Sequence, residues 1–181
     1  MKRGSIILAL ALALTFTACS RETKEAEKGV PEVYSEVAEG QAYALVDLGL
    51  SEKCLLIAKG DLDDYLGKNG AVTAQVYGVD NEGNLVDFGE VQSDGSGYLL
   101  KVETPYLYVC GGHDIDLLYP NVETGTLDVY EGARIEFGET TDTFFYTKDG
   151  VEKEVEDMTE FDNLLERYSD KAELIDFGSN K

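Results

Sequence analysis

Residues 71–91, AVTAQVYGVDNEGNLVDFGEV, decide the fold class of this 181-residue chain. Apolar side chains fall on every second position from Val72 to Val76, which is the period of a strand with one buried face. The segment 80–84, DNEGN, carries the residue types that form tight turns, and the apolar pattern resumes from Leu85 to Val91. The stretch therefore predicts a β-hairpin.

Short apolar runs bounded by glycine, serine or proline continue on both sides of this hairpin and predict further strands. Residues 93–97 and 148–150 predict further turns. Residues 61–66 instead predict a single helical turn, with Asp61 as its cap and Gly67 as its stop. The predicted strands cover residues 42–46, 53–58, 98–102, 106–110, 133–137, 143–147 and 172–177, the last ended by Gly178.

A helix is predicted near the C-terminus. Apolar residues from Met158 to Tyr168 lie at helical spacing, so one face of this helix would cover one side of a sheet. Thr159, three positions before Asp162, fits a capping pattern at its start. We therefore expect a single mainly β domain over residues 41–178, an antiparallel sandwich or open barrel with one C-terminal helix.

A weak internal repeat lies within the predicted strands. Each copy is a strand, a turn with glycine and a second strand, and this resembles part of a β-propeller blade. Two copies are too few to close a propeller ring, so two ordinary hairpins with the same spacing are the favoured interpretation. The matched positions are Tyr77, Gly83, Leu85 and Phe88 in the first copy and Tyr119, Gly125, Leu127 and Tyr130 in the second.

The N-terminus has the pattern of an export signal. Lys2 and Arg3 precede an apolar run over residues 6–16, and small residues follow it. The run is shorter than the roughly 20 residues that cross a bilayer. Residues 16–19, FTAC, are similar to the lipobox of bacterial lipoprotein signals. The resemblance implies a signal peptide over residues 1–18, lipidation of Cys19, and a protein anchored outside the cytoplasm, at the cell membrane or the outer surface.

Residues 19–40 are rich in charge and poor in apolar side chains, and they predict a flexible tether. A short helix over residues 32–38 is the alternative. The whole chain has 36 acidic and 15 basic residues, a net charge of −21. This disfavours nucleic acid as a partner, because nucleic-acid binding needs basic patches. The excess of acid serves solubility or attracts cations and basic partners, and the first use is the commoner.

Two further cysteines, Cys54 and Cys110, allow two interpretations. In an exported protein they form a disulfide, or they are two buried thiols that behave as small apolar groups. Both alternatives stay open at the level of sequence. Neither residue has a neighbouring cysteine at metal-ligand spacing, so no metal site is predicted.

One cluster carries groups that are capable of chemistry. Gly111, Gly112, His113, Asp114 and Asp116 combine the only histidine with two carboxylates, which suits a general base or a metal ligand. The alternative, which we favour, is a loop in which the glycines let the chain turn.

Tyr106 and Tyr108, just before this cluster, would share a face of their strand by its two-residue period. An exposed pair would stack on a ligand, whereas packing within the sheet is the commoner use of such tyrosines.

The stretch 76–114 also resembles uncharacterised lipoproteins of anaerobic Firmicutes. The matching segments are GEV at 89–91, GSGY at 95–98, LY at 107–108 and GGH at 111–113. The resemblance implies an exported lipoprotein and brings no activity with it.

The leading hypothesis is therefore a non-enzymatic, membrane-anchored lipoprotein with a binding surface near residues 106–116, an unidentified protein or small-molecule ligand, and no cofactor. A small exported hydrolase using His113 with Asp114 or Asp116 is one alternative. A structural subunit of an envelope complex is another.

Overall fold

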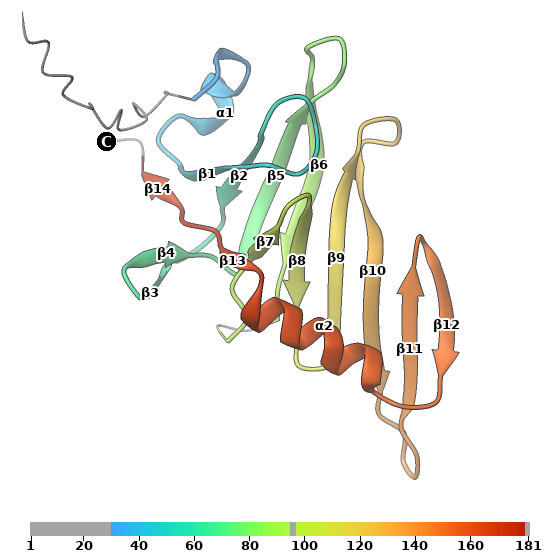
Figure 1. The fold of residues 1–181 in the computed structure, drawn as a ribbon. Coiled ribbons are helices and arrows are strands. Elements are labelled where there is room, and N and C mark those ends of the chain that lie inside the picture. The colour runs from blue at the N-terminus through green and yellow to red at the C-terminus, as the bar shows by residue number, and fades with distance from the viewer. Residues whose placement is uncertain (1–29, 95–96, 180–181) are drawn as a thin grey trace, which may run out of the picture.

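The computed structural model describes residues 30–94 and 97–179. The expected signal peptide, Cys19 and the first part of the expected tether lie outside the described residues. Within them, every strand pairing is antiparallel, and the strands form two large sheets and one small hairpin (Figure 1). The expected mainly β class with one substantial C-terminal helix is confirmed.

The first sheet has five strands in the order β14-β1-β2-β5-β6. The second has seven, in the order β12-β11-β10-β9-β8-β7-β13. The strands of the first are β1 (Ala42–Val46), β2 (Cys54–Ala58), β5 (Thr73–Val79), β6 (Leu85–Gln92) and β14 (Gly178–Ser179). Those of the second are β7 (Lys101–Glu103), β8 (Tyr106–Cys110), β9 (Asp114–Asn121), β10 (Thr126–Glu136), β11 (Thr143–Lys148), β12 (Val151–Val155) and β13 (Glu173–Leu174).

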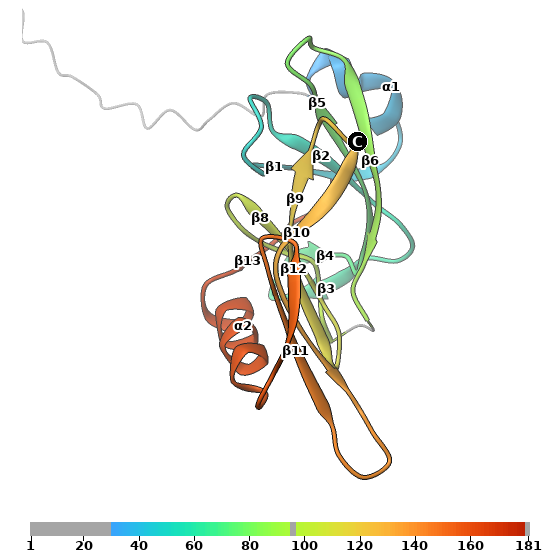
Figure 2. The ribbon, with the colours of Figure 1, turned by 90° about the vertical axis from the view of Figure 1, so that its right-hand side faces the viewer.

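The two sheets pack against each other over part of their area because their strands alternate apolar residues between two faces. From β2, Cys54 and Leu56 enter a core that Leu107 of β8 joins from the other sheet. Leu55 and Ile57 point the opposite way, into a second core. Figure 2 shows the five-stranded sheet near the upper end of the molecule and the C-terminal helix beside the lower half of the seven-stranded sheet.

The outer face of the five-stranded sheet is covered by the 3-10 helix η1 (Glu32–Tyr34) and the short helix α1 (Ser35–Ala38). Tyr34 is fully buried there, and its hydroxyl donates to the Lys53 carbonyl at 2.8 Å. The folded domain therefore begins before residue 41, which corrects the boundary expected from sequence. The charged residues of this stretch face solvent while Tyr34 and Ala38 pack on the sheet.

Residues 61–66 do not form the expected helical turn. They lie in a hairpin of β3 (Asp63–Tyr65) and β4 (Lys68–Gly70). Leu66 and Gly67 have φ values of 55° and 80°, as the two central residues of a tight primed hairpin turn require. Gly67, which sequence reasoning assigned to the end of a helix, instead supplies a left-handed position in this turn.

The C-terminal helix α2 (Thr159–Asp170) lies on the face of the seven-stranded sheet that is turned away from the other sheet (Figure 2). Phe161, Leu164 and Tyr168 pack there on Tyr108 and other residues of the sheet. The expected Thr159 cap is wrong, because the N-cap residue is Met158, whose side chain makes no capping hydrogen bond. The Asp157 carboxylate before it accepts the Thr159 N–H at 2.9 Å. No helix in the described part of the chain is long and apolar enough to cross a membrane.

The repeated hairpins belong to different sheets, β5–β6 to the first and β9–β10 to the second. These sheets have five and seven strands and not the four of a propeller blade, so the favoured interpretation of two ordinary hairpins is retained. Of the strand predicted over residues 133–137, residues 133–136 form the end of the long strand β10. The strand predicted over residues 172–177 is also wrong, because two short strands, β13 and β14, form at the C-terminus in its place. β13 pairs with β7, and the chain then crosses to the other sheet, where β14 pairs with β1.

Candidate functional site

The two tyrosines that were expected to share a face of their strand both pack on the core under α2, but they are buried to different extents. Tyr108 is fully buried under α2, where its hydroxyl donates to Glu103 at 2.7 Å. Tyr106 is half-buried at the start of β8 and lines a groove. The sheet-packing interpretation therefore holds for Tyr108, and only Tyr106 of the pair can contact a ligand.

We call this groove the tyrosine groove. It has a volume of about 240 Å³, is open to solvent, and lies where the loop after β1 meets the seven-stranded sheet. Three neighbouring strands supply its tyrosines: Tyr106 from β8, Tyr119 from β9 and Tyr130 from β10. The Tyr106 and Tyr130 rings stack with their centroids 4.3 Å apart. Its other lining residues are Leu48, Gly49, Leu50, Pro105 and Pro120.

A β-bulge in β10 explains why Tyr130 reaches the groove. Val129 pairs with Leu118 and Glu131 with Leu117, so Tyr130 is the extra residue between them. The bulge lets the consecutive side chains of Tyr130 and Glu131 point to the same side of the sheet. Lys148 contacts both of them, with its Nζ 3.9 Å from the Tyr130 ring centroid and 3.2 Å from a Glu131 oxygen.

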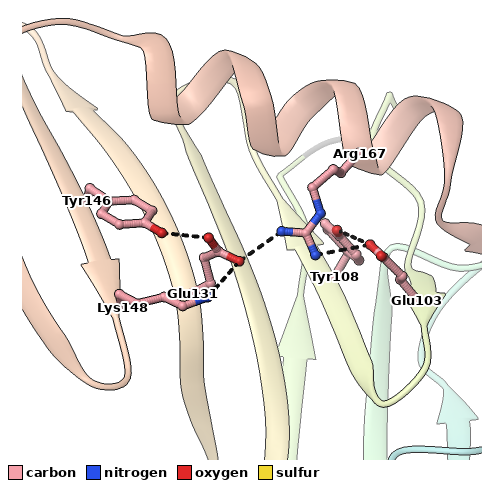
Figure 3. Close-up of polar contacts among 6 residues, drawn as sticks. All are labelled: Glu103, Tyr108, Glu131, Tyr146, Lys148 and Arg167. Atoms are coloured by element: carbon pink, nitrogen blue, oxygen red, sulfur yellow. Dashed lines mark hydrogen bonds and ion pairs between the residues drawn. The ribbon is translucent and has the colours of Figure 1, made fainter.

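A charged network next to the groove holds α2 to the sheet (Figure 3). Arg167 of α2 donates to Glu131 at 2.8 Å and to Glu103 at 3.2 Å. Tyr146 also donates to Glu131, at 2.6 Å. Burial on its own would raise the pKa of Glu131, but the hydrogen bonds from its three donors outweigh burial and lower it. Glu131 is therefore an anion that fixes α2, β11 and the bulge relative to one another.

The glycine–aspartate cluster is the turn between β8 and β9, as its favoured interpretation expected. The Gly111 N–H donates to the Asp114 carbonyl at 2.7 Å. Gly111 is needed because a Cβ there would overlap the Asp114 carboxylate. Gly132 of β10 similarly leaves room for the carboxylate of Asp116, its cross-strand partner. The carboxylates of Asp114 and Asp116 thus occupy space that is free because two glycines have no side chain.

His113 does not join these carboxylates. It is exposed, and its ring meets the edge of Phe137 with centroids 5.5 Å apart. Gly112 beside it is also exposed. Within residues 30–94 and 97–179, no hydrogen bond links the His113 ring to Asp114 or Asp116, and no group of ligating side chains has the geometry of a metal site. The hydrolase hypothesis therefore gains no support from this geometry.

Cys54 and Cys110 are two buried free thiols, so the disulfide alternative is not realised. Cys54 lies in the core between the sheets, whereas Cys110 lies in the core under α2. The seven-stranded sheet separates these two cores. Burial raises the pKa of each thiol to about 12, which keeps both protonated at neutral pH.

Asp116 is the carboxylate of the predicted cluster whose pKa is raised by its surroundings. Burial, followed by the charges of Asp114 and Glu152, raises its pKa from 3.8 to about 6. Because the folded state holds this proton more tightly than the unfolded chain, stability is expected to fall as the pH rises through this window. Asp116→Asn should raise the free energy of unfolding by about 2 kcal/mol at about pH 8 and by little at about pH 4. Urea unfolding at both pH values measures this.

Glu154→Gln on the exposed strand β12 is the matched control, since the Glu154 side chain is exposed and forms no hydrogen bond or ion pair in the described chain. It should shift stability by less than about 0.5 kcal/mol at either pH. An equal gain from both substitutions would mean that relief of overall negative charge, and not the burial of Asp116, explains the effect.

A second cavity, of about 310 Å³, lies between β1 and the crossing C-terminal segment. Its lining includes Leu45, Asp47, Lys53 and Thr104 but no aromatic side chain. The smaller tyrosine groove offers the better site, because rigid aromatic rings bring large contact areas at low entropic cost.

Sequence reasoning identified Tyr106 but not the rest of the groove. Tyr119 and Tyr130 were visible as tyrosines on predicted strands, yet the bulge that places Tyr130 leaves no signal in the sequence. Comparison of the chain with protein-family models, with curated proteins and with solved structures finds no match.

Proposed function

We propose that this protein is a lipid-anchored binding protein that acts outside the cytoplasm and contacts its ligand through the tyrosine groove. The observation that carries the binding role is the row of three tyrosines from adjacent strands, open to solvent and flanked by Leu48, Leu50 and two prolines. Tyr119 is exposed, Tyr106, Tyr130 and Leu50 are partly exposed, and Leu48 is buried. Contiguous apolar and aromatic surface that solvent reaches marks interaction sites.

The construction of the groove favours binding over catalysis. Its lining contains no carboxylate, histidine, cysteine or lysine, so it lacks the usual acids, bases and nucleophiles other than tyrosine itself. Its tyrosines lie on paired strands and not on long loops. A surface that is already ordered loses little entropy when a ligand binds.

A fragment screen tests the binding role. We expect ligand-observed NMR with a mixed set of aromatic, saccharide and short peptide fragments to give hits that Tyr119→Ala weakens by about fivefold or more. Tyr119 is 37% exposed, so its truncation should leave the fold intact. Tyr65→Ala, on the β3–β4 hairpin, is the control, because Tyr65 is 57% exposed and lies outside the groove. Hits that survive Tyr119→Ala unchanged would contradict the proposal.

The anchor is tested separately by intact mass. We expect protein extracted from the host membrane to start at Cys19 and to carry added acyl mass, and we expect Cys19→Ser to keep the uncleaved N-terminus. Cys54→Ser should be processed like the wild type, since Cys54 is a core residue. Normal cleavage without acyl mass, or normal processing of Cys19→Ser, would refute the lipid anchor.

A further inference from the structure

We infer that the tyrosine groove takes an extended, basic peptide segment of a partner protein, in the polyproline II conformation. This inference rests on the proposed binding function and names the class of ligand. Three observations lead to it: the charge around the groove, the pairing of the strands beneath it, and its open shape.

The charge around the groove is negative. Asp128 is the cross-strand partner of Tyr119, and hydrogen bonds from Asn121 and then Thr126 lower its pKa, so it stays ionised. Asp47 accepts the N–H of the lining residue Gly49 at 3.0 Å. Asp149 also contributes to the electrostatic environment of Tyr106.

Lys148, which contacts Tyr130 of the groove, already has a carboxylate partner. Lys148 forms an ion pair with Glu131 while its Nζ lies over the Tyr130 ring. A ligand in the groove therefore meets carboxylates that form no ion pair within residues 30–94 and 97–179, in a chain whose net charge is −21. Charge complementarity of this kind selects a basic partner and speeds its association.

The strands beneath the groove favour one mode of peptide recognition. Tyr106, Tyr119 and Tyr130 lie on β8, β9 and β10; β9 pairs with both neighbours, whereas β10 pairs with β11 only from Glu131 onward, so in the described chain residues 126–129 keep one unpaired edge. The groove itself is lined by the three tyrosines and not by this edge, so we take the rings as the recognition surface. A polyproline II segment suits such a surface, because it needs no hydrogen-bonded ladder and loses little entropy on binding.

The open shape of the groove argues against a small ligand. Pockets for small molecules enclose most of the ligand surface. This groove is open to solvent and has room for about two side chains, at about 240 Å³. A longer chain would place two residues on the tyrosines and its basic side chains against Asp128 and Asp47.

Fluorescence anisotropy with the full chain in detergent tests this. The probe is a labelled decapeptide of alternating lysine and proline. We expect it to bind about tenfold more tightly than the glutamate–proline peptide, and more tightly than a lysine–glycine peptide of equal charge. Tyr119→Ala should weaken binding by about fivefold, Asp128→Asn by about twofold, and Tyr65→Ala not at all.

Four outcomes would overturn the inference. Equal binding of the lysine–glycine peptide, or binding that Tyr119→Ala leaves unchanged, would mean non-specific attraction to an acidic protein. Binding of cellohexaose in place of the peptides, lost in Tyr119→Ala, would refute the peptide class while supporting the proposed binding function. If Tyr119→Ala weakens the binding of neither the peptides nor cellohexaose, and the fragment screen is also negative, both proposals fail.

Discussion

Arg167→Met is expected to lower the free energy of unfolding by about 3 kcal/mol, because it removes the shared cation between two partly buried carboxylates. The Arg167 side chain is 26% exposed, and its partners Glu131 and Glu103 are 13% and 32% exposed. Methionine keeps most of the apolar stem, so the decrease in the free energy of unfolding measures mainly the removal of the charge. Urea unfolding of both proteins at neutral pH measures it.

Arg134→Met is the matched control on the opposite face of the same sheet. Arg134 forms ion pairs with Glu136 and Glu152, but these carboxylates are 57% and 44% exposed. Surface pairs of this kind contribute less than about 1 kcal/mol. Equal losses from the two substitutions would show that the network under α2 is no more protected from solvent than a surface pair, and would remove its role in fixing the bulge at Tyr130.

Tyr34→Ala is expected to cost about 4 kcal/mol, which is the largest effect of a single substitution that we predict. Tyr34 is fully buried against the five-stranded sheet, and its truncation leaves a cavity beside Leu55 and Ile57. It also removes the hydrogen bond to the Lys53 carbonyl. Tyr34→Phe isolates that hydrogen bond and should cost about 1 kcal/mol.

Thermal and urea unfolding of the two Tyr34 variants distinguish a packed N-terminal segment from a tether. A loss below about 1 kcal/mol for Tyr34→Ala would mean that residues 32–38 contribute nothing to the fold. The predicted loss would mean that any truncation intended to remove a tether must stop before residue 30.

The sequence predicted those features that depend on neighbouring residues. The hairpin around residues 80–84 forms as expected, because the Asp80 carboxylate accepts the N–H groups of Glu82 and Asn84 at 2.8 Å within the turn. The helix near the C-terminus forms for a similar reason, since its apolar residues repeat at helical spacing regardless of the surface they cover.

Local sequence patterns gave wrong predictions where the same residue type is common in two different structures. Gly67 fits the end of a helix and the left-handed position of a hairpin turn equally well, and only pairing between β3 and β4 selects the second. The charge of residues 19–40 favoured a tether, whereas the alternative of a short helix over residues 32–38 is what forms, because Tyr34 and Ala38 are buried against a sheet built from later residues.

The candidate site depends most on tertiary structure. The sequence by itself determined a mainly antiparallel β chain with a C-terminal helix, because strand period, turn residues and helix amphipathicity act over a few positions. Only the packing of two sheets brought Leu48 and Leu50 to the tyrosines, and only a bulge turned Tyr130 toward Tyr106. The same packing placed Cys54 and Cys110 in separate cores. Such contacts join residues tens of positions apart, and their choice depends on how whole faces fit together and not on any local pattern.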